Sequence, residues 1–236
     1  MCFSATASFV ASGVLLPLGA ATLAIAVTKG DRLTVPLAMA PILFSLQQAL
    51  EGMVWLGLAR GSGNDSVTVG AVVAYLFFAF AFWPMWIPWA ALRLWPEEKR
   101  SPLLLPLISA LGLVPGTVLW LPLLRHPQSA LPEQIGHSLV YPLTPWSAGL
   151  LPEGVGHMVY VVWIVLPLFL VPSVRMRTFA LSLLLAFGLT QWASSQALTS
   201  VWCFASALLS VQILWILREP PFPAPRPLQD QGQAPT

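Results

Sequence analysis

The fold is decided by residues 33–59, LTVPLAMAPILFSLQQALEGMVWLGLA, a long apolar stretch whose one charged side chain is Glu51. At about 1.5 Å per residue, a helix of this length crosses the ~30 Å hydrocarbon core of a bilayer. The whole chain has the same character, because 57% of its 236 residues are hydrophobic and 8% are charged. Soluble domains carry about 25% charged residues, and so few charges cannot cover an ordinary water-facing surface. The sequence therefore predicts an all-α, polytopic membrane protein surrounded by the lipid bilayer.

Apolar runs between charged or turn-forming residues predict seven transmembrane helices within one domain, residues 1–218. They cover residues 5–27, 33–59, 67–94, 103–124, 157–174, 179–199 and 201–217. The last two are separated by so few residues that we expect them to be antiparallel neighbours. The remaining residues, 219–236, are rich in proline and are expected to form a disordered tail.

Basic residues gather on one side of this predicted bundle. Of the 11 Lys and Arg residues, only Arg60 and Arg125 fall on the other side. The positive-inside rule then places the N-terminus outside and the C-terminus, with its tail, in the cytoplasm. We expect a multi-pass protein of the cell membrane. The net charge of +2 gives no sign of a nucleic-acid partner.

Glu51 is the clearest candidate for chemistry, because ionisable groups inside the hydrocarbon region are rare and usually functional. Helical spacing of three and four residues puts Gln47, Gln48 and Trp55 on the same face. A carboxyl there can carry protons, act as a general acid or base, or bind a cation. The alternative is a protonated Glu51 that joins helices by a hydrogen bond.

Smaller polar side chains in the last two predicted helices face the same outer region. They are Gln191, Ser195 and Ser206. Small polar residues are ordinary packing material between membrane helices, but their convergence on Glu51 predicts a polar pocket that opens outward.

Both cysteines and one histidine lie close to the predicted outer face. Cys2 precedes the first helix, Cys203 begins the last, and His157 begins the fifth. Together with Glu51, which could act as base toward a metal-bound water, they provide the ligand types of a zinc site. The alternatives are a disulfide between Cys2 and Cys203, or two inert apolar thiols.

The N-terminal heptapeptide MCFSATA resembles the opening of an uncharacterised family of bacterial multi-pass membrane proteins. Residues 43–55, in which Gln48, Glu51 and Trp55 match, and the segment Ser200-Val201-Trp202-Cys203 are also similar to that family. The resemblance implies a bacterial inner membrane protein and brings no activity with it.

The sequence predicts an integral membrane protein that binds or senses a small molecule or ion in a pocket around Glu51. One alternative is a zinc- or thiol-dependent enzyme at the outer face. The other is a proton- or cation-coupled transporter, although polar residues fade on the cytoplasmic side of Gln47 and Gln191. Walker, GxGxxG, GxSxG and HExxH motifs are absent, which excludes several enzyme classes.

Overall fold

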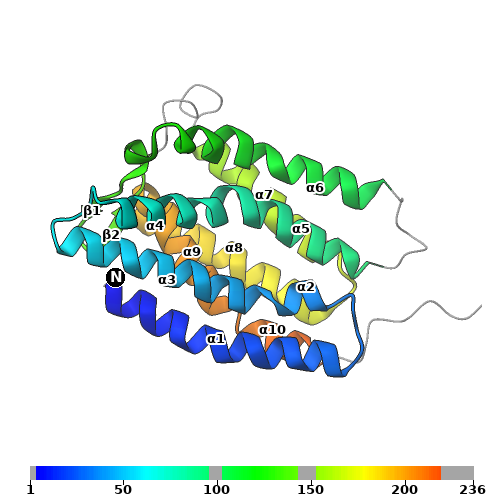
Figure 1. The fold of residues 1–236 in the computed structure, drawn as a ribbon. Coiled ribbons are helices and arrows are strands. Elements are labelled where there is room, and N and C mark those ends of the chain that lie inside the picture. Colours follow the sequence, from blue (N-terminus) through cyan, green and yellow to red (C-terminus); the bar gives the residue numbers. More distant parts are fainter. Residues whose placement is uncertain (1–3, 96–102, 143–152, 219–236) are drawn as a thin grey trace, which may run out of the picture.

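The computed structural model describes residues 4–95, 103–142 and 153–218, mostly as helices that run along a common direction (Figure 1). Five helices are long and apolar enough to cross a membrane: Ala5–Thr28, Val35–Ala59, Ser66–Arg93, Pro106–Leu124 and Val174–Ile216. Gly154–Leu170 is a shorter apolar helix. The count differs from the predicted seven because Gly154–Leu170 is short for a span and Val174–Ile216 counts as one helical run, although its backbone turns at Ser194. The tail, residues 219–236, lies outside the described residues.

The first helices pack through small side chains, as is usual between membrane helices. They are α1 (Ala5–Thr28), α2 (Val35–Ala38) and α3 (Ala40–Ala59). The Thr22 hydroxyl donates to the carbonyl of Ala38 at 2.8 Å, and Ser45 donates to the carbonyl of Ser12 at 2.8 Å. These short contacts hold α3, which carries Glu51, closely against α1.

The next helix contains two prolines, and aromatic donors take the carbonyls near them. It consists of α4 (Ser66–Phe77), the π-helical η1 (Phe78–Phe82) and α5 (Trp83–Arg93). Pro88 has no N–H, so the carbonyl of Pro84 lacks its helical partner and accepts from Trp163 Nε1 at 2.8 Å. Tyr160 donates to the carbonyl of Ala79 inside η1. This stretch therefore stays helical through contacts with the helix that carries Tyr160 and Trp163.

A second π-helical segment packs against η1. The fourth helix is built from α6 (Leu104–Pro115), η3 (Gly116–Trp120) and the 3-10 turn η4 (Leu121–Leu124). A Cβ on Gly116 would lie 2.7 Å from the Ala81 side chain, and one on Gly112 would lie 2.7 Å from Met85 Cα. Glycine at both positions permits this close approach.

The connection after η4 contains structure that the sequence does not predict. The 3-10 turn η5 (Pro127–Ala130) leads into an antiparallel hairpin of β1 (Glu133–Ile135) and β2 (Ser138–Val140). Gly136, with φ +59°, forms the turn. The hairpin lies at the end of the bundle where α1 begins (Figure 1).

The remaining helices begin earlier than predicted. They are α7 (Glu153–Leu170), α8 (Val174–Ser194), η6 (Ser195–Ala197), α9 (Leu198–Leu209) and α10 (Gln212–Ile216). The prediction that one helix ends at residue 174 and the next begins at residue 179 is wrong. Ser173 caps α8, accepting from the N–H of Met176, so this helix already begins at Val174. The backbone turns at Ser194 (φ −159°, ψ 55°), and α9 then packs against α8 as predicted.

The buried apolar residues form two cores along the bundle. The larger core lies toward α10 and includes Leu15, Leu37, Leu168 and Ile213. The smaller core lies toward the hairpin and includes Trp55, Tyr75, Tyr141 and Cys203. The residues around Glu51 belong to the hairpin end.

Candidate functional site

Glu51 lies at a meeting point of three helices. Its side chain is 1% exposed, and Ser200 of α9 donates to its Oε1 at 2.5 Å. Tyr75 of α4 is in polar contact with the same carboxyl and also donates to the carbonyl of Thr199 at 3.3 Å. The site is therefore assembled by contacts between distant parts of the chain, since Glu51 and Ser200 are 149 residues apart.

The predicted polar face of α3 is entirely buried. Gln47 and Gln48 are 0% exposed, and Trp55 is 6% exposed. The Oε1 atom of Gln47 accepts from Trp83 Nε1 at 2.7 Å. However, both amide atoms of Gln48, the Nε2 of Gln47 and the Nε1 of Trp55 have no hydrogen-bond partner. This face carries more hydrogen-bonding capacity than the surrounding side chains use.

Tyr141, just after β2, closes the hairpin side of the site. Its ring stacks on Tyr75, with centroids 5.1 Å apart and an interplanar angle of 19°. Its hydroxyl is buried without a partner. Burial raises the pKa of Tyr141 well above its usual range, and the nearby Glu51 and Cys203 act in the same direction. The hydroxyl is therefore protonated at neutral pH and can donate a hydrogen bond.

Cys203 is a buried thiol next to these groups, and it forms no disulfide within the described part of the chain. It is in polar contact with Tyr75, and the Gln47 amide also approaches it. The chain has three tyrosines, and all of them lie within electrostatic range of this thiol. We call the assembled group the Glu51 cluster: Gln47, Gln48, Glu51, Trp55, Tyr75, Tyr141, Ser200 and Cys203.

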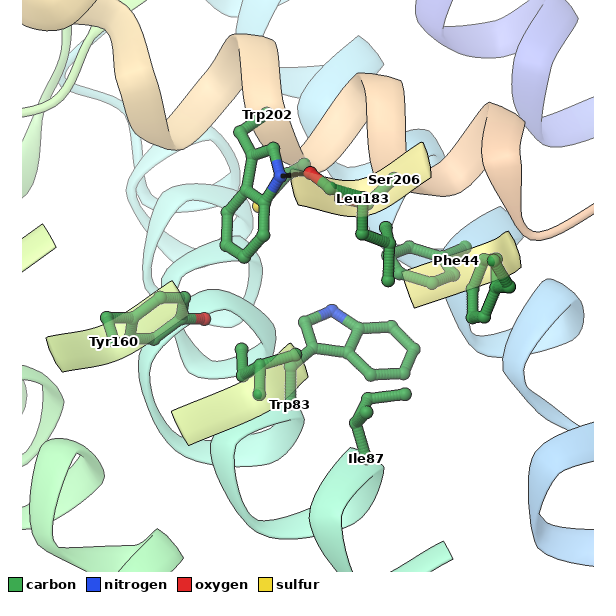
Figure 2. A pocket seen from close by; sticks show the side chains of 10 residues that line it. Phe44, Trp83, Ile87, Tyr160, Leu183, Trp202 and Ser206 are labelled. Atoms are coloured by element: carbon green, nitrogen blue, oxygen red, sulfur yellow. Dashed lines mark hydrogen bonds between the residues drawn. The ribbon is translucent and has the colours of Figure 1, made fainter. Parts of the chain in front are cut away.

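An aromatic cavity of about 30 Å³ lies beside Cys203. Figure 2 shows the side chains that line it. Cys203 belongs to both the cavity and the Glu51 cluster, and Trp83, which lines the cavity, donates to Gln47 of the cluster. Trp202 meets Tyr160 edge to face, with centroids 5.6 Å apart. The other lining residues are Phe44, Ile87, Tyr160, Ile164, Phe179, Leu183, Trp202 and Ser206. The predicted Ser206 thus lies beside Cys203, in a space with mostly apolar walls.

Two other predicted pocket residues lie elsewhere. Ser195 is exposed in η6 and lines a surface groove of about 290 Å³ between η6 and the hairpin. Gln191 is half-buried on α8, with an unpartnered Oε1. Among the described residues, neither lines the cavity beside Cys203. The break at Ser194 ends the helical spacing on which the prediction for Ser195 depended, whereas Gln191 lies on α8 before the break.

The predicted zinc ligands do not come together among the described residues. No group of three or more His, Cys, Asp and Glu side chains there is arranged to hold a metal ion. His157 lies on α7, which packs against α5 and α8, whereas Glu51 and Cys203 lie where α3, α4 and α9 meet. Cys2 lies outside the described residues, so a site that includes it and the Cys2–Cys203 disulfide both stay predictions.

Three members of the cluster were not predicted as site residues: Tyr75, Tyr141 and Ser200. The sequence contains one indication for the two tyrosines and another for the serine. Tyrosine is rare in this chain, and Ser200 is one helical turn before Cys203. Their convergence on Glu51 depends on tertiary packing, which a single sequence does not reveal.

The fold and the site together define a class: a bundle of apolar, membrane-compatible helices that encloses an acidic polar cluster near one end. Residues 1–227 match the model of a family described as "family of unknown function (DUF6629)". The chain belongs to that family. No curated protein and no solved structure matches it.

Proposed function

We propose that this chain is a seven-span protein of the cell membrane that binds a small molecule or ion at the Glu51 cluster. The run Val174–Ile216 has 43 residues, roughly 65 Å of helix, about twice the thickness of the hydrocarbon core. This length is enough for two spans, and the turn at Ser194 would separate them. The 18 residues of α7 add about 27 Å, which brings the number of spans to seven.

The distribution of basic residues supports an outward-facing cluster. At the α10 end, Lys29 donates to the carbonyl of Leu217 at 2.6 Å and Arg175 donates to that of Trp215 at 2.6 Å. Arg60, by contrast, follows α3 at the hairpin end. The positive-inside rule assigns the α10 end to the cytoplasm. A reporter fused after residue 218 should then be active only as a cytoplasmic reporter, and periplasmic activity would contradict this orientation.

The observation that carries the binding function is the concentration of unpartnered polar atoms around one buried carboxyl. A buried polar atom without a partner costs about 1–3 kcal/mol. Atoms of this kind occur on Gln47, Gln48, Trp55 and Tyr141. A ligand that bonds to these atoms offsets that cost, whereas a purely structural role for Glu51 needs only Ser200 and Tyr75.

The surroundings of the cluster favour binding over passage across the membrane. The adjoining cavity is walled on the α10 side by Phe44, Ile87, Ile164 and Leu183. A transport path would need polar groups that continue through this region. The apolar walls of this cavity therefore favour a closed binding site over a transport path.

The proposal can be tested by thermal unfolding of the detergent-purified protein with a panel of small compounds. The panel contains monovalent and divalent cations, amines, polyols, amino acids and small carboxylates, each at millimolar concentration. We expect at least one compound class to raise the unfolding midpoint of the wild type and to leave Glu51→Gln unchanged.

The matched control is Glu133→Gln, because Glu133 is an exposed glutamate on β1. This variant makes the same chemical change away from the cluster and should respond as the wild type does. A panel in which no compound distinguishes the wild type from Glu51→Gln would contradict the proposed function.

A further inference from the structure

The surface groove at the hairpin end is separate from the Glu51 cluster and has room for a ligand of its own. It measures about 290 Å³ and lies between the hairpin and the turn that joins α8 to α9. Liquid water takes about 30 Å³ per molecule, so the groove holds roughly ten waters, which is enough space for one sugar ring. Its size is close to the lower end of small-molecule sites, about 300–1,000 Å³.

The groove exists because the chain changes direction beside it. The backbone leaves helical geometry at Ser194, so η6 does not continue α8. The strand β2 packs against both η6 and α9, and its residues Ser138 and Val140 form the opposite wall. Two segments far apart in the sequence therefore build the groove.

The polar side chains of the groove are neutral and accessible. Ser195 and Gln196 are exposed, and Ser138 and Ser194 are half-buried. Ser194 precedes η6, but its hydroxyl makes no capping hydrogen bond there. A serine hydroxyl both donates and accepts, and a glutamine amide offers atoms of both kinds. Such a set suits a ligand that carries hydroxyl groups, since each of these also donates and accepts.

Charge excludes several other ligand classes. None of the described residues that line the groove is charged. Phosphates, carboxylates and ammonium groups are usually selected by charge-assisted hydrogen bonds, and they would find no opposite charge here. The lining therefore favours a neutral polar ligand.

Trp192 supplies an aromatic face to the same groove. It is 87% exposed, the largest value among the exposed large hydrophobic side chains of the described chain. The face of an indole ring is negative, so it attracts the weakly positive C–H groups on the flat side of a sugar ring. A tryptophan that only anchors the protein at the membrane interface needs neither an adjoining groove nor polar neighbours.

From size, neutral hydrogen bonding and the exposed indole together, we infer that this groove binds a neutral saccharide, one pyranose ring at a time. The ring stacks on Trp192, and its hydroxyls bond to Ser195 and Gln196. In the orientation proposed above, the groove opens outward, where such a ring is available as a free sugar or as the head group of a glycolipid. Binding here is independent of Glu51.

Saturation-transfer NMR of the full chain in phosphatidylcholine nanodiscs tests the ligand class. The probes are the methyl glycosides of glucose, galactose and mannose, together with sorbitol and glucuronate. We expect at least one glycoside to bind better than the other two compounds. Sorbitol has the hydroxyls but no ring to stack, and glucuronate carries a charge that finds no partner. Equal or tighter binding of sorbitol or glucuronate would overturn the inference.

Variants of the lining identify the site. Trp192→Ala should lower the affinity for the best glycoside about tenfold or more, whereas Trp192→Phe keeps an aromatic face and should retain most of it. Gln196→Ala should lower the affinity several-fold. The control is Trp215→Ala, because Trp215 is 42% exposed on α10, at the other end of the bundle. It should bind as the wild type does. Unchanged affinity in Trp192→Ala would contradict the assignment.

A second set of nanodiscs separates the two sources of the sugar. Part of the phosphatidylcholine is replaced by a glycolipid with the same sugar as its head group. A groove filled by the head group would give no further response to the free glycoside, whereas a groove for the free sugar would respond as before. Both results support the ligand chemistry. If no glycoside binds in phosphatidylcholine nanodiscs, the saccharide inference fails, and the proposed function, which Glu51→Gln tests, stands.

Discussion

The two buried cores of this bundle differ in how completely their polar atoms are paired. Toward α10, buried hydroxyl and indole groups have partners, as Thr22 has in the carbonyl of Ala38 and Trp163 has in the carbonyl of Pro84. Toward the hairpin, the core surrounds Glu51, and amide, indole and phenol groups remain unpartnered. Under the proposed function, the hairpin core retains a costly arrangement that a ligand can use, whereas the α10 core serves stability.

Introducing a polar group into the α10 core should have the largest effect. Leu168 is 0% exposed on α7 within that core. Leu168→Gln removes apolar contacts and buries an amide without designed partners, so we expect a loss of about 3 kcal/mol or more in the free energy of unfolding. Denaturant titration in detergent measures it. A loss below about 1 kcal/mol would show that this core tolerates polar groups, and the contrast between the two cores would disappear.

Removing the hydroxyl that bonds to Glu51 should have an intermediate effect. Ser200→Ala leaves the carboxyl with fewer partners, and we expect a loss of about 1–3 kcal/mol. Ser129→Ala is the control, because Ser129 is exposed and donates to the carbonyl of His126. It should change stability by less than about 0.5 kcal/mol. Equal effects of the two substitutions would show that Ser200 does not hold Glu51.

A smaller effect is expected at the surface of the hairpin end. Asp65 caps α4, accepting from the N–H of Thr68 at 2.7 Å, and this hydrogen bond lowers the pKa of its carboxyl. A lowered pKa in the folded state stabilises the protein at pH values above the unfolded pKa of about 3.9, and the contribution is lost as the pH falls through the folded value. Asp65→Ala should therefore lower the unfolding midpoint slightly at pH 7, and the difference from the wild type should vanish below the folded pKa. A difference that grows in acid would contradict this account.

The sequence predicted the parts of the site that depend on one helix. Spacing along α3 placed Gln47, Gln48, Glu51 and Trp55 on one face, and all four are buried. The partner Ser200 could not be derived in this way, because its contact with Glu51 joins residues far apart in the chain.

The ends of the predicted helices also show that local sequence does not reveal tertiary structure. The first three predicted helices end within a few residues of the observed ones, because charged residues and turns flank them. Prediction failed at Ser194, where the backbone leaves helical geometry, and in the connection that forms the hairpin and brings Tyr141 over Tyr75. The local amino-acid composition does not reveal that the hairpin packs Tyr141 onto Tyr75.

Under the proposed function, the hairpin core keeps unpartnered polar atoms for a ligand, at a cost in stability. Gln48 tests this claim most directly, because its side chain is 0% exposed and both of its amide atoms lack partners. Thermal and denaturant unfolding of Gln48→Leu, without added ligand, should show a protein about 1–3 kcal/mol more stable than the wild type. A Gln48→Leu protein that is less stable than the wild type would contradict the claim, because it would show that the amide already contributes to the fold.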